Sequence, residues 1–199
     1  MDIIVQQQEL WTPGKRRGHV RADVRFFHPG EREPFREDLG LTNIWHDEGE
    51  LYMLSLAFAT AYANYGSPTV ANMYLGLDDR AALAEADTLA SLTNELPATP
   101  LPGVGYARIA LSTAGTGAGG QDFVISQPAA AYRVTSKSCV FTAGGAWLQV
   151  RNMFLTTHAT AVASAAGQRL LASLALSHGP VTLALGDTVT ATIYVGISE

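Results

Sequence analysis

The stretch Pro180–Ser198 constrains the fold of this chain most, because its residues alternate strictly between apolar and polar types. Leu183 and Leu185 share one face before a Gly186-Asp187 turn. After the turn, one face carries Val189, Ala191, Ile193, Val195 and Ile197, and the other carries Thr188, Thr190, Thr192 and Tyr194. A period of two with β-branched residues predicts strands, and the Gly-Asp turn between them predicts a hairpin. A strand with one apolar face needs a second layer to cover that face.

The length suits one compact domain with an appendage or one large β domain, and the composition argues against nucleic acid and membrane as partners. The chain has 199 residues, of which 47% are hydrophobic, which is enough for a sizeable core. Its net charge of −5 argues against nucleic acid as a partner. The single cysteine, Cys139, excludes an intrachain disulfide and is typical of a small buried residue in a strand. We expect no signal peptide, and Leu51–Ala63 is too short and too polar to span a bilayer, so we expect synthesis in the cytoplasm and no membrane partner.

Residues 1–40 differ in composition from the rest of the chain. They hold seven of the 13 Lys and Arg residues, and prolines and glycines interrupt any long regular element. Within them Val20–Phe26 alternates and predicts one strand, with Val20, Ala22, Val24 and Phe26 on a single face. The basic run 14–19 could bind nucleic acid, but an acidic chain with carboxylates nearby favours a solvated turn or a contact with an acidic partner. We therefore predict an extended arm at residues 1–40 that packs on another subunit, and a β domain at residues 41–199.

The rest of the chain predicts one long helix followed by many strands. Asp47–Ala63 is the helix: Asp47 can cap it, acidic residues lie near its start, and apolar residues recur at helical spacing. Ala81–Ala90 contains helix formers and would suit a second, short helix. The predicted strands are Thr69–Leu77, Gly105–Leu111, Phe123–Gln127, Tyr132–Thr142, Ala146–Thr156 and Arg169–Ser177, followed by the closing hairpin. In the run that contains Cys139, we expect Val134, Ser136, Ser138 and Val140 to share one side. Together these elements predict an antiparallel β-sandwich, jelly-roll or immunoglobulin-like, with one N-terminal amphipathic helix and an extended N-terminal arm.

No spacing in the sequence predicts a catalytic or metal site. The five histidines, His19, His28, His46, His158 and His178, share no ligand spacing. The densest set of metal-ligand types is residues 46–50, where helix capping explains the carboxylates without a metal. Asp78-Asp79 could serve a glycosidase, but a turn uses aspartate for its own backbone hydrogen bonds. No GxSxG sequence frames a nucleophile, and the Gly-rich loop Thr113–Gly120 lacks the ending of a phosphate-binding loop. We therefore predict no catalytic residue, no metal and no cofactor.

Three stretches, in this order, resemble small structural proteins of tailed bacteriophages. The first is Glu48-Gly49-Glu50-Leu51 at the start of an apolar helix, followed by the strand Asn72–Leu77. The second is Ala86–Glu95 followed by Gly105–Ser112, which resembles a segment ending in a Gly-Tyr-Ala-Arg strand. The third is Leu170–Ala172 with the closing strand Leu185–Thr192. The resemblance covers residues 47–199. It departs from the family at the loop with prolines between 97 and 102, which puts the loop geometry there in doubt, and residues 1–40 lie outside it.

This resemblance implies a non-enzymatic component of the virion, in the head, neck or tail. We expect its partners to be other virion proteins, and we expect a homo-oligomer, because virion sites are repeated by symmetry. The residues expected to make the docking contacts are Trp11, Arg16, Arg17, Arg21, Phe26 and Phe27. Two alternatives stay open. A carbohydrate-binding module for a host surface would need Trp45 or Trp147 exposed beside polar loops, and a hydrolase would need titratable groups that converge in a pocket.

Overall fold

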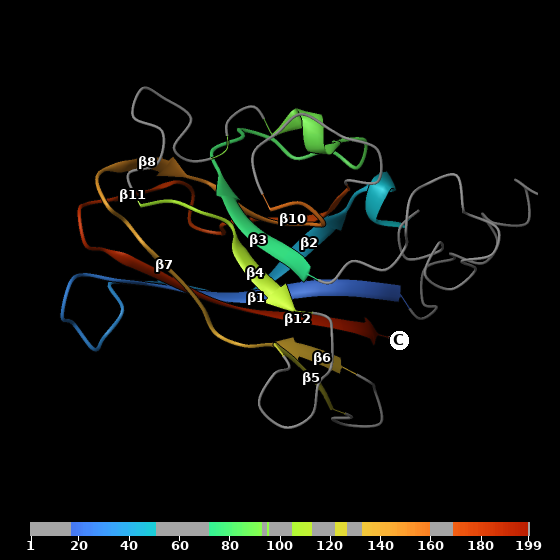
Figure 1. Ribbon diagram of the computed structural model, residues 1–199, viewed down its shortest axis with the longest axis horizontal. Helices are drawn as coiled ribbons and strands as arrows, with labels where there is room; N and C mark the ends of the chain where they lie inside the picture. The colour runs from blue at the N-terminus through green and yellow to red at the C-terminus, as the bar shows by residue number, and fades with distance from the viewer. Residues whose placement is uncertain are drawn as a thin grey trace, which may run out of the picture.

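The computed structural model describes residues 17–50, 72–92, 95, 105–112, 122–126, 133–159 and 169–198 of the chain. This part is mainly β, and its strands pair antiparallel in a ten-stranded sheet and a two-stranded sheet (Figure 1). The strands are β1 (Arg17–Phe27), β2 (Arg36–Trp45), β3 (Asn72–Asp78), β4 (Ile109–Ser112), β5 (Phe123–Ser126), β6 (Arg133–Ser136), β7 (Cys139–Thr142), β8 (Trp147–Val150), β9 (Asn152–Thr156), β10 (Leu170–Ala175), β11 (Val181–Leu183) and β12 (Thr188–Ser198). The prediction of a mainly β, antiparallel fold is confirmed.

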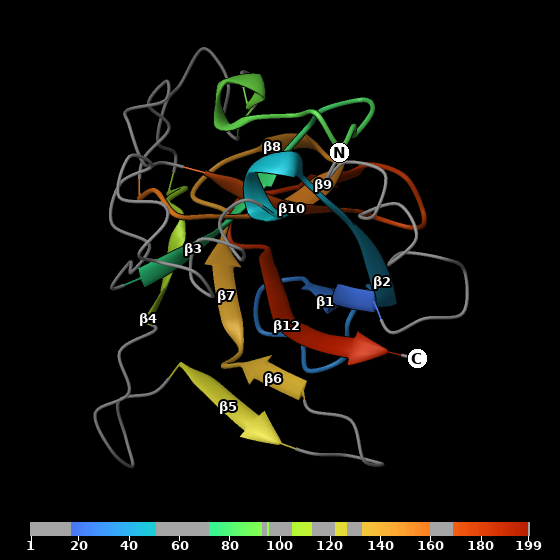
Figure 2. The same ribbon diagram turned by 90° about the vertical axis from the view of Figure 1, so that its right-hand side faces the viewer.

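The larger sheet bends at β2 into two layers. Its strand order is β4-β3-β9-β10-β2-β1-β12-β6-β5, with β7 also paired to β12. Residues 36–42 of β2 pair with β1, whereas residues 43–45 pair with β10. The first layer therefore consists of β2, β1, β12, β6, β5 and β7, and the second layer of β4, β3, β9 and β10. Figure 2 shows β1 and β12 running below β9 and β10.

The core lies between these layers and consists of the apolar faces that the alternation predicts. In β1, Val20, Ala22, Val24 and Phe26 are fully buried. In β12, Val189, Ala191 and Ile193 are buried, and Val195 packs against the same cluster. The second layer contributes buried apolar residues to this cluster, among them Leu75, Leu77, Leu111, Met153, Leu155 and Leu174. The predicted faces of these two strands are confirmed for the side chains that the structure describes.

The predicted division at residue 40 is wrong for residues 17–40. β1 lies inside the sheet between β2 and β12, and it pairs with β12 along its whole length, from Arg17↔Ser198 to Phe27↔Thr188. The physical reason is the apolar face of β1, which the chain buries in its own core instead of in a neighbouring subunit. Residues 1–16 of the predicted arm lie outside the described residues.

The predicted closing hairpin is also wrong, although both of its strands exist. β11 pairs with β8 in the two-stranded sheet, and β12 pairs with β1, β6 and β7 in the larger sheet. The turn between them is held by Asp187, whose Oδ2 accepts a hydrogen bond from the Ala184 N–H at 2.8 Å. Gly186 N–H donates to the Ala143 carbonyl at 2.7 Å, and Ala143 N–H donates to the Asp187 carbonyl at 2.8 Å. The turn is thus bonded to another part of the chain and leads from one sheet to the other.

Two predicted long strands are each divided in two. Residues 137–138 separate β6 from β7, and Arg151 separates β8 from β9. Because of the first break, Cys139 and Phe141 face the core while Ser138 and Val140 are exposed, so the predicted shared side of that run ends at Ser136. Cys139 is a buried residue in a strand, as predicted.

Helical structure is brief in the described part of the chain. Residues 47–50 are helical, and the first i→i+4 hydrogen bond runs from the Glu50 N–H to the His46 carbonyl at 3.0 Å, so Asp47 lies in the first turn and not at the cap. The rest of the helix predicted over Asp47–Ala63 lies outside the described residues. In place of the short helix predicted at Ala81–Ala90 there is a 3₁₀ turn, η3 (Leu89–Ser91).

Segments packed on the outer side of the second layer bury that side as well. Every residue of β9 is buried; Phe154 points away from the main core and clusters with Leu89, Leu92 and Leu170. Two glycines make this packing possible. A Cβ at Gly76 would overlap the ring of Phe154, its cross-strand partner, and a Cβ at Gly49 would overlap the carbonyl group of Leu171.

The contact between Gly76 and Phe154 can be tested by Gly76→Ala. We expect this substitution to lower the free energy of unfolding by about 1–3 kcal/mol, because the added methyl group overpacks the site. Urea unfolding measures the change. The control is the same substitution in a Phe154→Leu background, where the ring is gone and the alanine should cost little. An equal loss in both backgrounds would show that the ring is not the obstacle.

Candidate functional site

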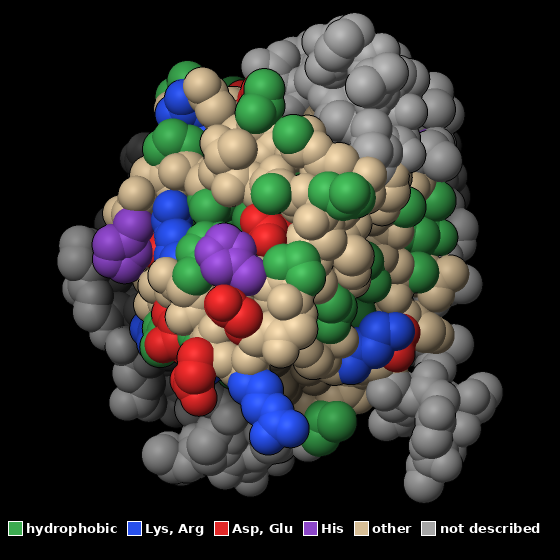
Figure 3. Space-filling view, turned by 90° about the vertical axis from the view of Figure 1, so that its left-hand side faces the viewer, with side chains coloured by type: hydrophobic (Ala, Val, Ile, Leu, Met, Phe, Trp, Pro, Cys, Tyr) green, Lys and Arg blue, Asp and Glu red, His purple; other side chains and the backbone are tan. Residues whose placement is uncertain are grey.

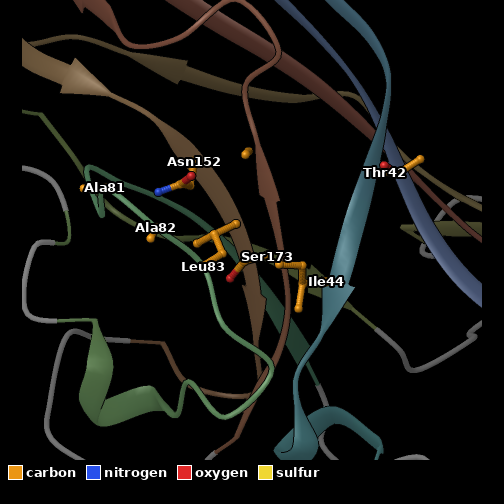
Figure 4. A pocket seen from close by; sticks show the side chains of 8 residues that line it. Thr42, Ile44, Ala81, Ala82, Leu83, Asn152 and Ser173 are labelled. Carbon is orange, nitrogen blue, oxygen red and sulfur yellow. The ribbon is translucent and has the colours of Figure 1, made fainter.

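A pocket of about 330 Å³ opens between the second layer and the covering segment, which we define as residues 79–92 (Figure 4). One wall is formed by residues 81–83 of the covering segment, and the others by β2, β9 and β10. Its lining residues are Thr42, Ile44, Ala81, Ala82, Leu83, Asn152, Ser173 and Ala175. Most of these side chains are apolar, and the polar ones are those of Thr42, Asn152 and Ser173.

Asn152 and Ser173 belong to a buried polar network centred on Arg80. The Arg80 guanidinium donates to Asp78 Oδ2 at 2.8 and 3.1 Å, to Asp87 Oδ2 at 2.9 Å and to Ser173 Oγ at 2.8 Å. Asn152 Nδ2 donates to Asp78 Oδ1 at 2.7 Å and to the Arg80 carbonyl at 2.8 Å. Asp78 is fully buried and Arg80 nearly so. The network therefore fastens the covering segment to the outer side of the second layer.

His46 extends this network, and its surroundings favour the neutral form of its ring. Its Nδ1 lies 2.9 Å from the Ala84 carbonyl oxygen, which can only accept, so Nδ1 carries the proton. Its Nε2 lies 2.8 Å from Ser173 Oγ and, in the neutral ring, accepts the hydroxyl hydrogen, while the same oxygen accepts from Arg80. Burial lowers the pKa of His46, and the positive charge of Arg80 contributes to the lowering.

A serine that donates to a histidine is the arrangement found in hydrolases, but here the surroundings differ. Ser173 is fully buried, and His46 Nδ1 is oriented by a backbone carbonyl instead of a carboxylate. A nucleophile needs access to its substrate and a base that gains a proton, whereas burial disfavours protonation of this imidazole. The geometry therefore suits a structural link between β10, the 46–50 turn and the covering segment.

Sequence reasoning missed this cluster because its members are far apart in the chain. Ser173 and His46 are separated by 127 residues, and Ser173 and Arg80 by 93. The one local signal is that Ser173 interrupts the apolar run Leu170–Ala175. In the described ranges there is no group of three or more His, Cys, Asp or Glu side chains that could hold a metal ion. Among those same residues, no helix has the length and apolarity needed to cross a membrane.

A second buried network joins the residues just before β4 to Glu95 and to the end of β3. Arg108 donates to both carboxylate oxygens of Glu95, at 2.7 and 2.6 Å, and to the His158 carbonyl at 2.7 Å. The Tyr106 hydroxyl lies 2.9 Å from Glu95 Oε1 and accepts from the Leu77 N–H at 2.9 Å. Burial, followed by the negative charge of Glu95, raises the pKa of Tyr106 well above its usual value. The Tyr-Ala-Arg part of the resemblance thus supplies buried structural contacts.

Cys139 carries no reactive thiol. Burial raises its pKa to about 11, so the thiol stays protonated at neutral pH.

Two imidazole–carboxylate pairs connect the region around the β1–β2 connection to the turns before and after β11. His28 Nδ1 lies 3.0 Å from Asp187 Oδ1, and its ring stacks on Phe35 at 4.2 Å between centroids. His178 Nδ1 contacts Asp38 Oδ1, and the Ser177 hydroxyl donates to the same oxygen. In both pairs the carboxylate is buried and the imidazole is more than half exposed. Figure 3 shows a face of the molecule on which histidine side chains lie beside carboxylates.

The Asp38 carboxylate is stabilised by several donors. Arg36 Nε donates to it at 2.9 Å, and Arg36 Nη2 also donates to the Gly179 carbonyl at 2.8 Å. Burial alone would raise the pKa of Asp38, but the hydrogen bonds from Ser177, His178 and Arg36 outweigh it and lower the pKa below its usual value. These contacts fasten the turn after β10 to β2.

The structure does not bring the six predicted docking residues together. Trp11 and Arg16 lie outside the described residues, and of Arg17 only the backbone is described. Arg21 is exposed on β1, and Phe27 is half-buried. For Phe26 the prediction is wrong, because its ring is fully buried in the core beneath the Arg36 guanidinium, 5.3 Å from the ring centroid.

Neither of the two tryptophans in the described residues provides the exposed platform that a carbohydrate-binding module would need. Trp147 is 1% exposed and packs against Tyr106 in a T-shaped arrangement, with 5.7 Å between the ring centroids. Trp45 is partly buried and packs against the core.

Comparisons of the chain with protein-family models, with curated proteins and with solved structures found no match.

The structural role of Ser173 can be tested by Ser173→Ala. Loss of Oγ leaves buried groups of Arg80 and His46 without a partner, so we expect the free energy of unfolding to fall by about 1–3 kcal/mol. Ser138→Ala, at an exposed serine, is the matched control and should have little effect. We expect wild type and Ser173→Ala to hydrolyse p-nitrophenyl acetate equally slowly. Faster hydrolysis by the wild type would contradict a structural role.

The Asp38 contacts predict a pH dependence of stability. The pKa of Asp38 is lower in the folded protein than in the unfolded chain. Asp38 therefore stabilises the fold at pH values above the ordinary carboxyl pKa, and this stabilisation is lost as the pH falls through the pKa of the folded protein. At neutral pH, Asp38→Asn should lower the free energy of unfolding by about 3 kcal/mol, since it removes one partner of a buried pair. In urea unfolding at a series of pH values, the gap from wild type should narrow below about pH 4. A gap that stays constant down to acid pH would contradict this account; Asp47→Asn, at an exposed carboxylate, is the control.

Proposed function

We propose that this chain is a non-enzymatic structural component of a tailed-bacteriophage particle. The observation that carries the proposal is where the residues of the resemblance lie. Gly49 and Gly76 occupy positions with no room for a Cβ, Arg108 holds the buried Glu95, and Asp187 holds the turn before β12. The similar residues are therefore the ones that this packing requires, which supports a relationship in fold to those phage proteins.

The chemistry of the described residues supports a scaffold role. The charged groups of the two buried networks are all paired within the chain, and the serine and histidine beside the pocket are buried. A scaffold needs such satisfied contacts, whereas a catalyst needs a group left available for its substrate. Trp147 is buried and Trp45 packs against the core, so neither of these two residues favours the carbohydrate-binding alternative, and we propose no second function.

Within this proposal, the layered β fold is the stable body of the subunit, of jelly-roll or immunoglobulin-like type, and a helix follows residue 46. The N-terminal segment, together with the exposed Arg21 of β1, docks the subunit on other virion proteins in the head, neck or tail. Docking proceeds by strand addition and ion pairs, and repetition around a symmetric particle makes weak contacts sufficient through avidity.

The experiment is to purify particles of the phage that encodes the chain and to quantify the chain by mass spectrometry against the major capsid protein. We expect a fixed stoichiometry, and absence from washed particles would overturn the proposal. The triple variant Arg16→Ser, Arg17→Ser, Arg21→Ser should be lost from particles while it stays folded by circular dichroism. Arg32→Ser, Lys137→Ser, Arg151→Ser removes the same charge elsewhere and should be incorporated fully; equal incorporation of both variants would exclude the basic segment as the anchor.

A further inference from the structure

The pocket beside the covering segment has a floor that the strand register defines. Ile44 of β2 pairs with Ser173 of β10, and Ala175 of β10 pairs with Asn152 of β9. Paired residues share a face of the sheet, as do residues two apart in one strand, so these four form two adjacent rows on the outer side of the second layer. Residues 81–83 form a wall beside this floor (Figure 4).

Asn152 brings an unused hydrogen-bond acceptor to the pocket. Its side chain is 3% exposed, and its Nδ2 donates to the Asp78 carboxylate and to the Arg80 carbonyl. Because both partners are acceptors, the orientation of the amide is fixed and Oδ1 is the remaining end. Oδ1 accepts no hydrogen bond from the described residues. The one sealed and unpaired side-chain oxygen in that part of the chain is on Asp79, so Asn152 Oδ1 is open to the pocket that it lines.

The rest of the pocket selects against a charged ligand. Its lining has no charged side chain, and five of its eight residues are alanine, leucine or isoleucine. The nearest guanidinium, that of Arg80, already donates to Asp78, Asp87 and Ser173. A charge placed here would lose water without gaining a partner, whereas an apolar body would remove the alkyl side chains from water.

The size of the pocket limits the ligand further. Its volume of about 330 Å³ lies at the lower end of the range for small-molecule sites, about 300–1,000 Å³. We infer that the pocket binds a small neutral molecule with an apolar body of one or two rings and one N–H or O–H group, which donates to Asn152 Oδ1. This inference goes beyond the proposed function and does not depend on it, because no step of it concerns the particle.

The test uses indole as the probe and NMR of the purified full-length chain. We expect saturable shifts of the Ile44 and Leu83 methyl resonances and of the Asn152 side-chain amide. The dissociation constant should be about 1 mM, as suits a ligand of about nine non-hydrogen atoms. The methyl groups of Ile193, which is buried in the main core, should not shift.

A second probe, 1-benzothiophene, isolates the hydrogen bond, because it has the shape of indole and no N–H. We expect it to bind at least about threefold more weakly, since Oδ1 would lose its water without gaining a donor. Equal or tighter binding of 1-benzothiophene would contradict the role of Asn152. This comparison leaves Asn152 in place, which matters because its Nδ2 holds Asp78 and a variant there could fail to fold.

Ala175→Phe tests the position of the site. Ala175 is exposed and lines the pocket, so a phenylalanine ring there would occupy the space of the ligand. We expect this variant to lose the indole shifts. Ala110→Phe places the same ring at an exposed position of β4 and should bind indole as the wild type does. Circular dichroism shows whether each variant is folded.

A wild type without saturable shifts would overturn the inference, and so would shifts that Ala175→Phe leaves unchanged. The peptide of residues 8–14, which contains Trp11, is titrated in parallel. If this peptide binds and free indole does not, the pocket accepts a protein side chain and the assignment to a small molecule is wrong. Particle incorporation is a separate readout, so the virion role and the pocket can each fail without the other.

Discussion

The pairing of β1 with β12 is the interaction on which the rest of the structure depends. The two strands are 11 residues each and pair along their whole length, although they lie near opposite ends of the described chain. Closing so long a loop costs an entropy that grows only slowly with its length, and the buried apolar face of both strands offsets that cost. Every other strand of the larger sheet is placed relative to this pair, directly or through β2 or β6. A topology with such distant contacts also implies slow folding, because the closing strand comes last in the sequence.

Charged side chains and their buried partners then hold the segments between the strands in place. Arg80 holds the covering segment, Arg108 holds the region around Glu95, and Arg36 holds the turn after β10. Burying a charged group without a partner costs free energy. Each of these arginines therefore favours the one conformation of its segment in which the guanidinium has its hydrogen-bond partners. Ser173 and His46 beside the pocket also have their hydrogen bonds within the buried network, so their arrangement differs from that of an active site, where a reactive group is accessible to substrate.

Part of the fold could be predicted from the sequence because alternation is a local property. The alternation in residues 20–26 and 188–195 predicts which side chains point inward, regardless of which strand is the neighbour. Cys139 is buried as its residue type suggests. Which strands pair could not be predicted in the same way. β11 has the same alternation as β12 yet pairs with β8, because alternation indicates a buried face and does not identify the neighbouring strand. The candidate site was not predictable, since His46, Arg80 and Ser173 come from three separate parts of the chain.

The sequence by itself determined that this protein is mainly β and that β1 and β12 each have one apolar face. These properties follow from spacing along a few residues. Only the tertiary structure decided that residues 17–40 complete the sheet instead of leaving it, that Phe26 is core, and that Arg21 stands on an outward face beside Tyr194. All three depend on contacts between residues that are far apart in the sequence. A short segment does not specify these contacts, because burial depends on the fold of the whole chain.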